Sequence, residues 1–128
     1  MSAFLPYVLV AVGGGIGACF RHAVGQVTMR LLGPGFPYGT FTVNVVGGLL
    51  MGLLIGWLAQ RSMPQEVRLF FAVGLLGGFT TFSSFALDSV TLFERGDLAG
   101  LCLYILGSVS LSILAVFVGL FISRALGA

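Results

Sequence analysis

Charged residues are scarce in this sequence, and their scarcity decides the class of protein. Aspartate, glutamate, lysine and arginine make up 8% of the 128 residues, whereas soluble domains usually carry roughly 25%. Lysine is absent altogether, because the six basic side chains are all arginines. A chain with so few charges cannot cover itself with a water-facing surface, and 58% of its residues are hydrophobic. The composition therefore predicts an integral membrane protein that lies in a lipid bilayer.

Other shortages exclude whole classes of function. The net charge of +2 is too small to indicate a nucleic-acid partner. His22 is the only histidine, and the two cysteines, Cys19 and Cys102, have no metal-site spacing and are expected to pack as free thiols. No acid lies near the middle of the first, second or fourth expected span, and Asp88 lies near an end of the third. We therefore expect neither an intramembrane hydrolase nor a buried carboxylate that relays protons, and no enzyme activity.

Long uncharged runs are what the sequence has instead. A spanning helix needs about 20 apolar residues, and charged residues divide the chain into runs of that length over 1–20, 31–60, 69–87 and 98–123. The expected helices cover residues 4–28, 39–60, 67–95 and 98–125. The prediction is an all-α membrane protein with a single four-helix transmembrane domain over residues 1–128.

The arginines show no bias between the two sides of the membrane. The side with both termini and the middle link has Arg61, Arg68 and Arg124, and the opposite side has Arg21, Arg30 and Arg95. An ordinary inner-membrane protein has more basic residues on its cytoplasmic side. Two interpretations remain open. Either the rule is weak for so few charges, or the chain inserts both ways, so that an antiparallel homodimer can form.

Glycines are plentiful, with 20 in the chain. Gly48, Gly52 and Gly56 follow one another at intervals of four on the second expected helix, and Gly13 and Gly17 repeat this spacing on the first. Small residues at this interval let membrane helices approach closely. The pattern predicts tight helix contacts within or between subunits, and it does not identify a function.

The third expected span contains a sequence that disfavours a continuous helix. Residues 74–85 read GLLGGFTTFSSF, and the glycine pair followed by Phe79, Thr80 and Thr81 is poor helix material. We expect a break over residues 77–81, near the middle of the membrane. Irregular backbone survives at that depth only where protein buries it or where it lines a cavity. The carbonyl groups that a break frees are good ligands for a hard cation.

Polar side chains occur at helical intervals on two other spans. Thr40, Asn44 and Gly48 share one face of the second expected helix. The Asn44 amide either makes a hydrogen bond between helices or donates to an anion. A second set at the same spacing, on the fourth expected helix, consists of Tyr104, Ser108 and Ser112. Serines often bond to their own helix, so this set is either structural or part of a polar path.

Two phenylalanines follow the expected break. Phe82 and Phe85 lie three residues apart, on one face of the resumed helix. An aromatic ring has a positive edge, so two rings presented edge-on would offer an anion a contact free of water. Core packing is the commoner role of such a pair, and both interpretations remain open.

Four motifs together resemble those of the small bacterial fluoride channels of the Fluc, or CrcB, family. They are GGGIGA at 13–18 leading to Arg21, GT at 39–40 with VN at 43–44 and Gly47, GLLGGFTTFSSF at 74–85, and ERG at 94–96. The third motif is the most specific, and the resemblance covers essentially the whole chain. It implies a passive fluoride-selective channel that exports fluoride across the bacterial inner membrane and so relieves fluoride toxicity.

The resemblance also implies an architecture and a set of functional residues. Subunits of the family form a dual-topology antiparallel homodimer with two fluoride pores and a central structural sodium ion. By matched position, the carbonyls of Gly77 and Thr80 hold the sodium, and Arg21 lies at the vestibule. The residues expected along the fluoride path are Asn44, Phe82, Phe85, Ser83, Ser84 and Ser112, with Tyr104, Ser108 and Thr40 close by.

Two positions depart from the family pattern. Family members often carry serine where this chain has Ala86, and threonine where it has Val116, so the hydroxyl track is thinner here. Two other functions share part of this pattern. A small dual-topology multidrug transporter would need a buried glutamate in the first helix, which is missing. A non-transporting membrane assembly protein would explain the glycines but not a broken third helix.

Overall fold

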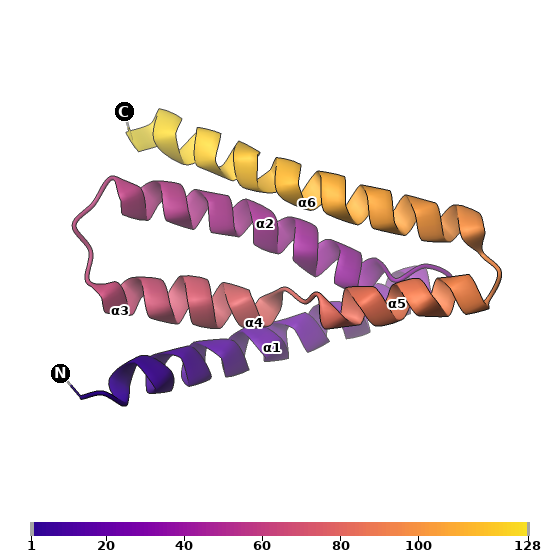
Figure 1. Cartoon of the computed structure of the whole chain (residues 1–128), viewed down its shortest axis with the longest axis horizontal. Helices are drawn as coiled ribbons and strands as arrows, with labels where there is room; N and C mark the ends of the chain where they lie inside the picture. Colours follow the sequence, from indigo (N-terminus) through magenta and orange to yellow (C-terminus); the bar gives the residue numbers. More distant parts are fainter. Residues whose placement is uncertain (1, 128) are drawn as a thin grey trace.

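The computed structural model describes residues 2–127, and four apolar stretches of it are long enough to cross a membrane. The described part of the chain is built of helices and the links between them (Figure 1). The spans are Leu5–Leu32, Tyr38–Ala59, Gln65–Glu94 and Leu98–Gly127. The prediction of an all-helical, four-span membrane protein is therefore confirmed. The start of the first span and the end of the last span lie at the same end of the bundle as the link between the second and third spans (Figure 1).

Three of the spans are single helices, and the third is divided. The single helices are α1 (Leu5–Leu32), α2 (Tyr38–Ala59) and α6 (Leu98–Gly127). The third span consists of α3 (Gln65–Arg68), the π-helix η1 (Leu69–Leu76), α4 (Gly77–Phe79) and α5 (Ser83–Glu94). The first helix extends four residues beyond the expected end. It stops at Gly33, whose φ of 79° ends the helix while its amide donates to the Met29 carbonyl at 3.0 Å.

The helices pack in two close pairs. Helix α2 lies along α6, and α1 lies against η1 and α4. Glycines make both contacts possible: a methyl group added at Gly52 would overlap the Val116 carbonyl, and one added at Gly17 would overlap the Leu75 carbonyl. Neither backbone could give way without separating the helices. The glycines thus act as contact surfaces, as the four-residue spacing predicts.

Non-helical backbone in the third span begins later than the sequence predicts. Gly77 and Gly78 are helical and belong to α4, and the residues outside helices are 80–82. Thr80 is extended, with φ −86° and ψ 161°. Gly78 has a different purpose, because a methyl group there would overlap the Gly14 carbonyl on α1. The expectation of irregular backbone from residue 77 is therefore corrected: both glycines are helical, and Gly78 allows α4 to pack closely against α1.

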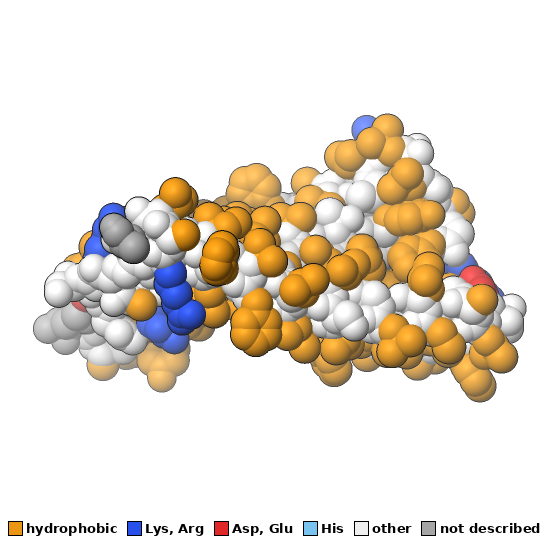
Figure 2. Space-filling view, turned by 90° about the horizontal axis from the view of Figure 1, so that it is seen from above, with side chains coloured by type: hydrophobic (Ala, Val, Ile, Leu, Met, Phe, Trp, Pro, Cys, Tyr) orange, Lys and Arg blue, Asp and Glu red, His pale blue; other side chains and the backbone are white. Residues whose placement is uncertain are grey.

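Few side chains are buried in the single subunit. Val43, Leu92 and Tyr104 are the largest that are fully enclosed among the described residues. Figure 2 shows apolar side chains spread along the visible face, with arginines gathered toward the ends. Apolar side chains point outward, where lipid tails or a second subunit would surround them.

Candidate ion-binding groove

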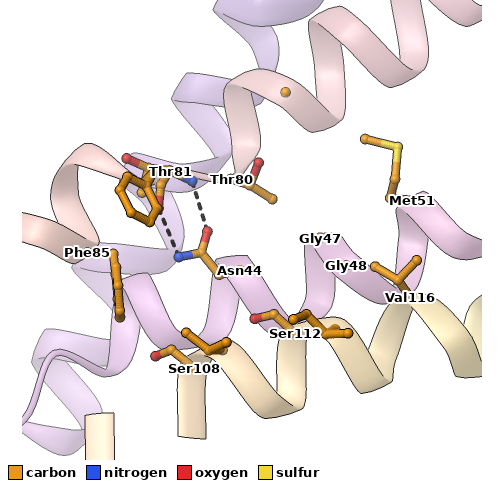
Figure 3. A pocket seen from close by; sticks show the side chains of 14 residues that line it. Asn44, Gly47, Gly48, Met51, Thr80, Thr81, Phe85, Ser108, Ser112 and Val116 are labelled. Carbon is orange, nitrogen blue, oxygen red and sulfur yellow. Dashed lines mark hydrogen bonds between the residues drawn. The ribbon is translucent and has the colours of Figure 1, made fainter. Parts of the chain in front are cut away.

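A groove of about 530 Å³ opens between α2, the third span and α6. It brings together many of the residues that the sequence singles out, although they lie far apart in the chain. Figure 3 shows Asn44 on α2 directed toward Thr81 of the third span, and Ser108 and Ser112 on α6 beside α2. The predicted site residues that line the groove are Asn44, Gly77, Thr80, Phe82, Phe85, Ser108 and Ser112.

The Asn44 side chain binds the backbone of Thr81 twice. Its Nδ2 donates to the Thr81 carbonyl at 2.9 Å, and its Oδ1 accepts the Thr81 amide at 2.8 Å. Both hydrogen bonds are drawn in Figure 3. The side chain therefore joins α2 to the non-helical residues 80–82. Sequence reasoning named Asn44 but missed Thr81, although its place directly after Thr80 in the motif was a usable signal.

The hydroxyl groups at the start of α5 bind one another and the backbone. Thr81 Oγ1 accepts the Ser84 amide at 3.2 Å and lies 3.3 Å from Ser83 Oγ. The first amides of a helix have no partner within it, so Thr81 acts as an N-terminal cap for α5. Ser83 and Ser84 were expected along the fluoride path. The structure places them at this cap, outside the residues that line the groove.

Two serines of α6, in contrast, have hydroxyls that make no hydrogen bond among the described residues. Ser108 is 4% exposed, and Ser108 Oγ and Ser112 Oγ are both buried without a hydrogen-bond partner among residues 2–127. A buried hydroxyl that makes no hydrogen bond is costly, and serine in a helix can usually bond to the carbonyl four residues earlier. Each of these two hydroxyls therefore has an unused hydrogen-bond donor among the described residues.

Tyr104 and Thr40 lie beside the groove rather than in it. Tyr104 is fully buried, and its hydroxyl donates to Asp88 Oδ2 at 2.9 Å. Thr40 lines a separate small cavity together with Asp88. The Tyr104 proton is thus committed to a carboxylate. Sequence reasoning noted Asp88 only as an acid near the end of a span, and the 16-residue separation from Tyr104 gave no sign of their contact.

The phenylalanines at the start of α5 differ in their surroundings. Phe82 is 79% exposed, whereas Phe85 packs against Tyr104 with ring centroids 5.2 Å apart. The two phenylalanine rings are tilted by 45° at a centroid separation of 5.7 Å. They are therefore near neighbours at the groove, and Phe82 extends beyond the subunit.

Arg21 binds the backbone next to the non-helical residues. Its Nε donates to the Gly78 carbonyl at 3.1 Å, across 57 positions of sequence. The family resemblance implied a vestibule position, and the structure places the side chain between α1 and α4. Here the guanidinium satisfies a carbonyl that the irregular backbone leaves without a helical donor.

Two carbonyl groups in the third span lose the amides that a continuous helix would supply. The amide of Thr81, which would donate to Gly77, binds Asn44 instead. The amide of Ser84, which would donate to Thr80, binds Thr81 Oγ1 instead. Within residues 2–127 there is no cluster of three or more metal-binding His, Cys, Asp or Glu side chains. The carbonyl oxygens of Gly77 and Thr80 are among the oxygens that this region can offer a cation.

Four apolar spans around a groove with spare hydroxyls define a small multi-pass membrane protein with a polar interior site. The family model described as "CrcB-like protein, Camphor Resistance (CrcB)" matches residues 8–120, and the chain belongs to this family. Together with the four spans, the family indicates a multi-pass protein of the bacterial inner membrane.

Curated relatives match almost end to end. A protein of Agrobacterium fabrum called "Fluoride-specific ion channel FluC" is 56% identical over 119 residues, which are 92% of this chain and 95% of the relative. A protein of the same name from Rhodopseudomonas palustris is 50% identical over 123 residues, 95% of this chain and 99% of the relative. "Fluoride-specific ion channel FluC 2" of Nitrobacter hamburgensis is also 50% identical over 123 residues.

Proposed function

We propose that this chain is a passive, fluoride-selective channel that exports fluoride across the inner membrane and so relieves fluoride toxicity. Relatives at 50–56% identity are named fluoride-specific ion channels, and the family consists of ion channels rather than enzymes. The observation that carries the proposal is the pair of buried, unpartnered hydroxyls of Ser108 and Ser112 in the groove.

The groove offers what a small, strongly hydrated anion requires. Fluoride gives up water only to strong hydrogen-bond donors, and each serine supplies one O–H. The ring edges of Phe82 and Phe85 add weaker positive contacts. Several moderate contacts serve conduction better than one tight site, since the ion must also leave. None of the residues that line the groove carries a carboxylate. A carboxylate there would repel an anion.

The active form in this proposal is an antiparallel homodimer with two pores. Three arginines on each side of the membrane support insertion in both orientations. The 79% exposure of Phe82 beside the groove supports a partner there, because a second subunit could complete the groove's open side. An antiparallel arrangement would also bring residues 80–82 near the same residues of the partner, at mid-membrane.

A structural sodium ion at the dimer centre is part of the proposal. The fit rests on the carbonyls of Gly77 and Thr80, whose helical donors are engaged elsewhere. Carbonyl oxygens are hard ligands suited to a hard cation. A bound cation there supplies positive potential that favours anions nearby. Two carbonyls from each subunit would give the ion four protein ligands.

The departures from the family pattern shorten the hydroxyl track of this proposed pore. Val116 lines the groove one turn beyond Ser112 and contributes methyl groups where family members often have a hydroxyl. Ala86 is exposed on α5 and also has none. The track on α6 therefore ends at Ser112, so that Ser108 and Ser112 supply a larger share of the donors.

The test of the proposal is an efflux assay. Purified protein in liposomes loaded with fluoride or chloride should release fluoride and retain chloride. Equal release of both ions would contradict a selective channel, and release of neither would favour a non-transporting assembly protein. A multidrug antiporter would instead exchange a cationic compound for protons, which requires an acidic residue that α1 does not have.

A further inference from the structure

Asn44 has fewer free hydrogen-bonding groups than its place in the groove suggests. A side-chain amide has two N–H donors and one oxygen acceptor. One N–H and the oxygen are already used by Thr81, so a single N–H remains for any ion. We infer that Asn44 is chiefly a positioning residue, which replaces the hydrogen bonds that the third span loses at Thr81.

The two hydrogen bonds copy those of a helix. In a continuous α-helix the Thr81 amide would donate to the Gly77 carbonyl, and the Thr81 carbonyl would accept the Phe85 amide. Asn44 Oδ1 takes the place of the first acceptor at 2.8 Å, and Asn44 Nδ2 takes the place of the second donor at 2.9 Å. The side chain of α2 therefore acts as a substitute peptide group. We call this pair of hydrogen bonds the Asn44 clamp.

The clamp determines where α5 begins. With its backbone held on both sides, Thr81 presents Oγ1 to the Ser84 amide at 3.2 Å and so caps the helix. Phe82 follows directly and projects from the subunit, with 79% of its surface exposed. The direction of the Phe82 ring therefore depends on the hold that Asn44 has on the preceding residue.

The clamp also explains why this irregular backbone is tolerated in a membrane. Each unpaired backbone group in an apolar interior is costly. Asn44 satisfies both groups of Thr81, and Arg21 satisfies the carbonyl of Gly78 at 3.1 Å. The Gly77 carbonyl is left without its usual donor by the same exchange of partners. One side chain thus stabilises the irregular segment and frees an oxygen for a cation.

Hydrogen exchange tests the clamp without any ion. In dimeric protein free of fluoride, Asn44→Leu should raise exchange of the Thr81 amide by about tenfold or more, since the amide loses its acceptor. Asn44→Asp keeps an acceptor oxygen and should retain most of the protection. Thr91→Val is the matched control, because the Thr91 hydroxyl bonds only to its own helix at Leu87. Unchanged exchange at Thr81 in Asn44→Leu would overturn the inference.

A double-substitution cycle separates positioning from direct fluoride binding, and this arm rests on the proposed function. Replacing the Thr81 amide by an ester removes the N–H that donates to Asn44 and leaves every side chain in place. If Asn44 acts through Thr81, the ester alone should slow fluoride efflux by about tenfold. When the ester is added to Asn44→Leu, it should slow fluoride efflux by less than about twofold. Effects that multiply would overturn the inference in favour of a fluoride ligand.

The control ester is placed at Ala86, whose amide donates to the Phe82 carbonyl at 2.9 Å in ordinary helical fashion. The Ala86 ester should slow fluoride efflux by the same factor in the wild type and in Asn44→Leu. If Asn44→Leu reduced the effect of the Ala86 ester as much as that of the Thr81 ester, a specific clamp would be contradicted. Wild-type protein that releases no fluoride would overturn the proposed function. The exchange measurement would still decide whether the clamp exists.

Discussion

Hydroxyl groups occur in two regions of this molecule, and the two regions use them differently. On α6, the hydroxyl oxygens of Ser108 and Ser112 are buried and have no hydrogen-bond partner among residues 2–127. At residues 80–84, by contrast, Thr81 Oγ1 accepts the Ser84 amide and lies within hydrogen-bond distance of Ser83 Oγ. Both regions carry serine or threonine. The two hydroxyls on α6 have no partner among the described residues, whereas those of Thr81 and Ser83 lie within hydrogen-bond distance of each other.

The backbone explains the difference. Helix α6 is continuous from Leu98 to Gly127 and satisfies its own amides and carbonyls, so its backbone does not require Ser108 or Ser112 as a partner. The third span loses helical hydrogen bonds at residues 80–82, and nearby polar side chains replace them. The regular helix thus leaves the hydroxyls of Ser108 and Ser112 without a partner among the described residues, whereas the irregular segment uses the hydroxyl of Thr81.

Removing the free hydroxyls should have the largest effect. Replacing Ser108 and Ser112 together by alanine should reduce fluoride efflux from liposomes by about 100-fold, because each hydrogen bond to a charged group contributes about 1.5–3 kcal/mol. Ser110→Ala is the matched control, since Ser110 is exposed on the same helix outside the groove. An efflux rate within about threefold of wild type in the double variant would contradict the role of α6.

Removing the cap at the start of α5 should have a smaller effect, expressed chiefly as stability. Thr81→Val deletes the oxygen that accepts the Ser84 amide, and loss of an N-terminal cap costs about 1 kcal/mol. Thermal unfolding in detergent should therefore occur at a lower temperature. Thr91→Val provides the comparison, because it removes a hydroxyl of the same helix that caps nothing. Equal melting temperatures for the two variants would show that Thr81 is not a cap.

Extending the α6 track should sharpen the comparison with a modest gain. Val116→Thr places a hydroxyl one turn beyond Ser112 in the groove, with nearly the same volume as valine. One added donor should raise the fluoride efflux rate by about two- to fivefold. This change corresponds to part of the free energy of a full hydrogen bond. Ala86→Ser is the companion variant on α5. A decrease in efflux for Val116→Thr would mean that an additional donor holds the ion too firmly.

Much of the fold was predictable because it depends on local composition. Uncharged runs of sufficient length give the four spans, and glycines at intervals of four give the close helix pairs. The position of the irregular backbone was not predictable in the same way. Gly78 reads as a helix breaker in sequence, yet its use depends on the approach of Gly14 from a helix 64 positions earlier. The π-helix Leu69–Leu76 has no sequence signal that we recognise.

The residues of the candidate site were largely predictable from the sequence, but their hydrogen-bond partners were not. Motif position pointed to Asn44, Phe82 and the α6 serines, and the groove brings them together. Sequence spacing cannot show that Asn44 is occupied by Thr81 while Ser108 is free, because hydrogen-bond partners depend on tertiary geometry. The contact of Tyr104 with Asp88 was missed for the same reason.

The smallest expected effect separates the two kinds of hydroxyl most directly. Ser83 is exposed, and its hydroxyl lies 3.3 Å from Thr81 Oγ1, so Ser83→Ala removes one weak, solvent-accessible interaction. Net contributions of such hydrogen bonds are about 0.5–1.5 kcal/mol at most, and water can replace the lost partner here. Fluoride efflux and melting temperature should both stay close to wild type, with a rate change of less than about twofold. Efflux measured beside Ser108→Ala checks this, because a loss at Ser83 equal to that at Ser108 would mean that hydroxyls at the start of α5 also bind the ion.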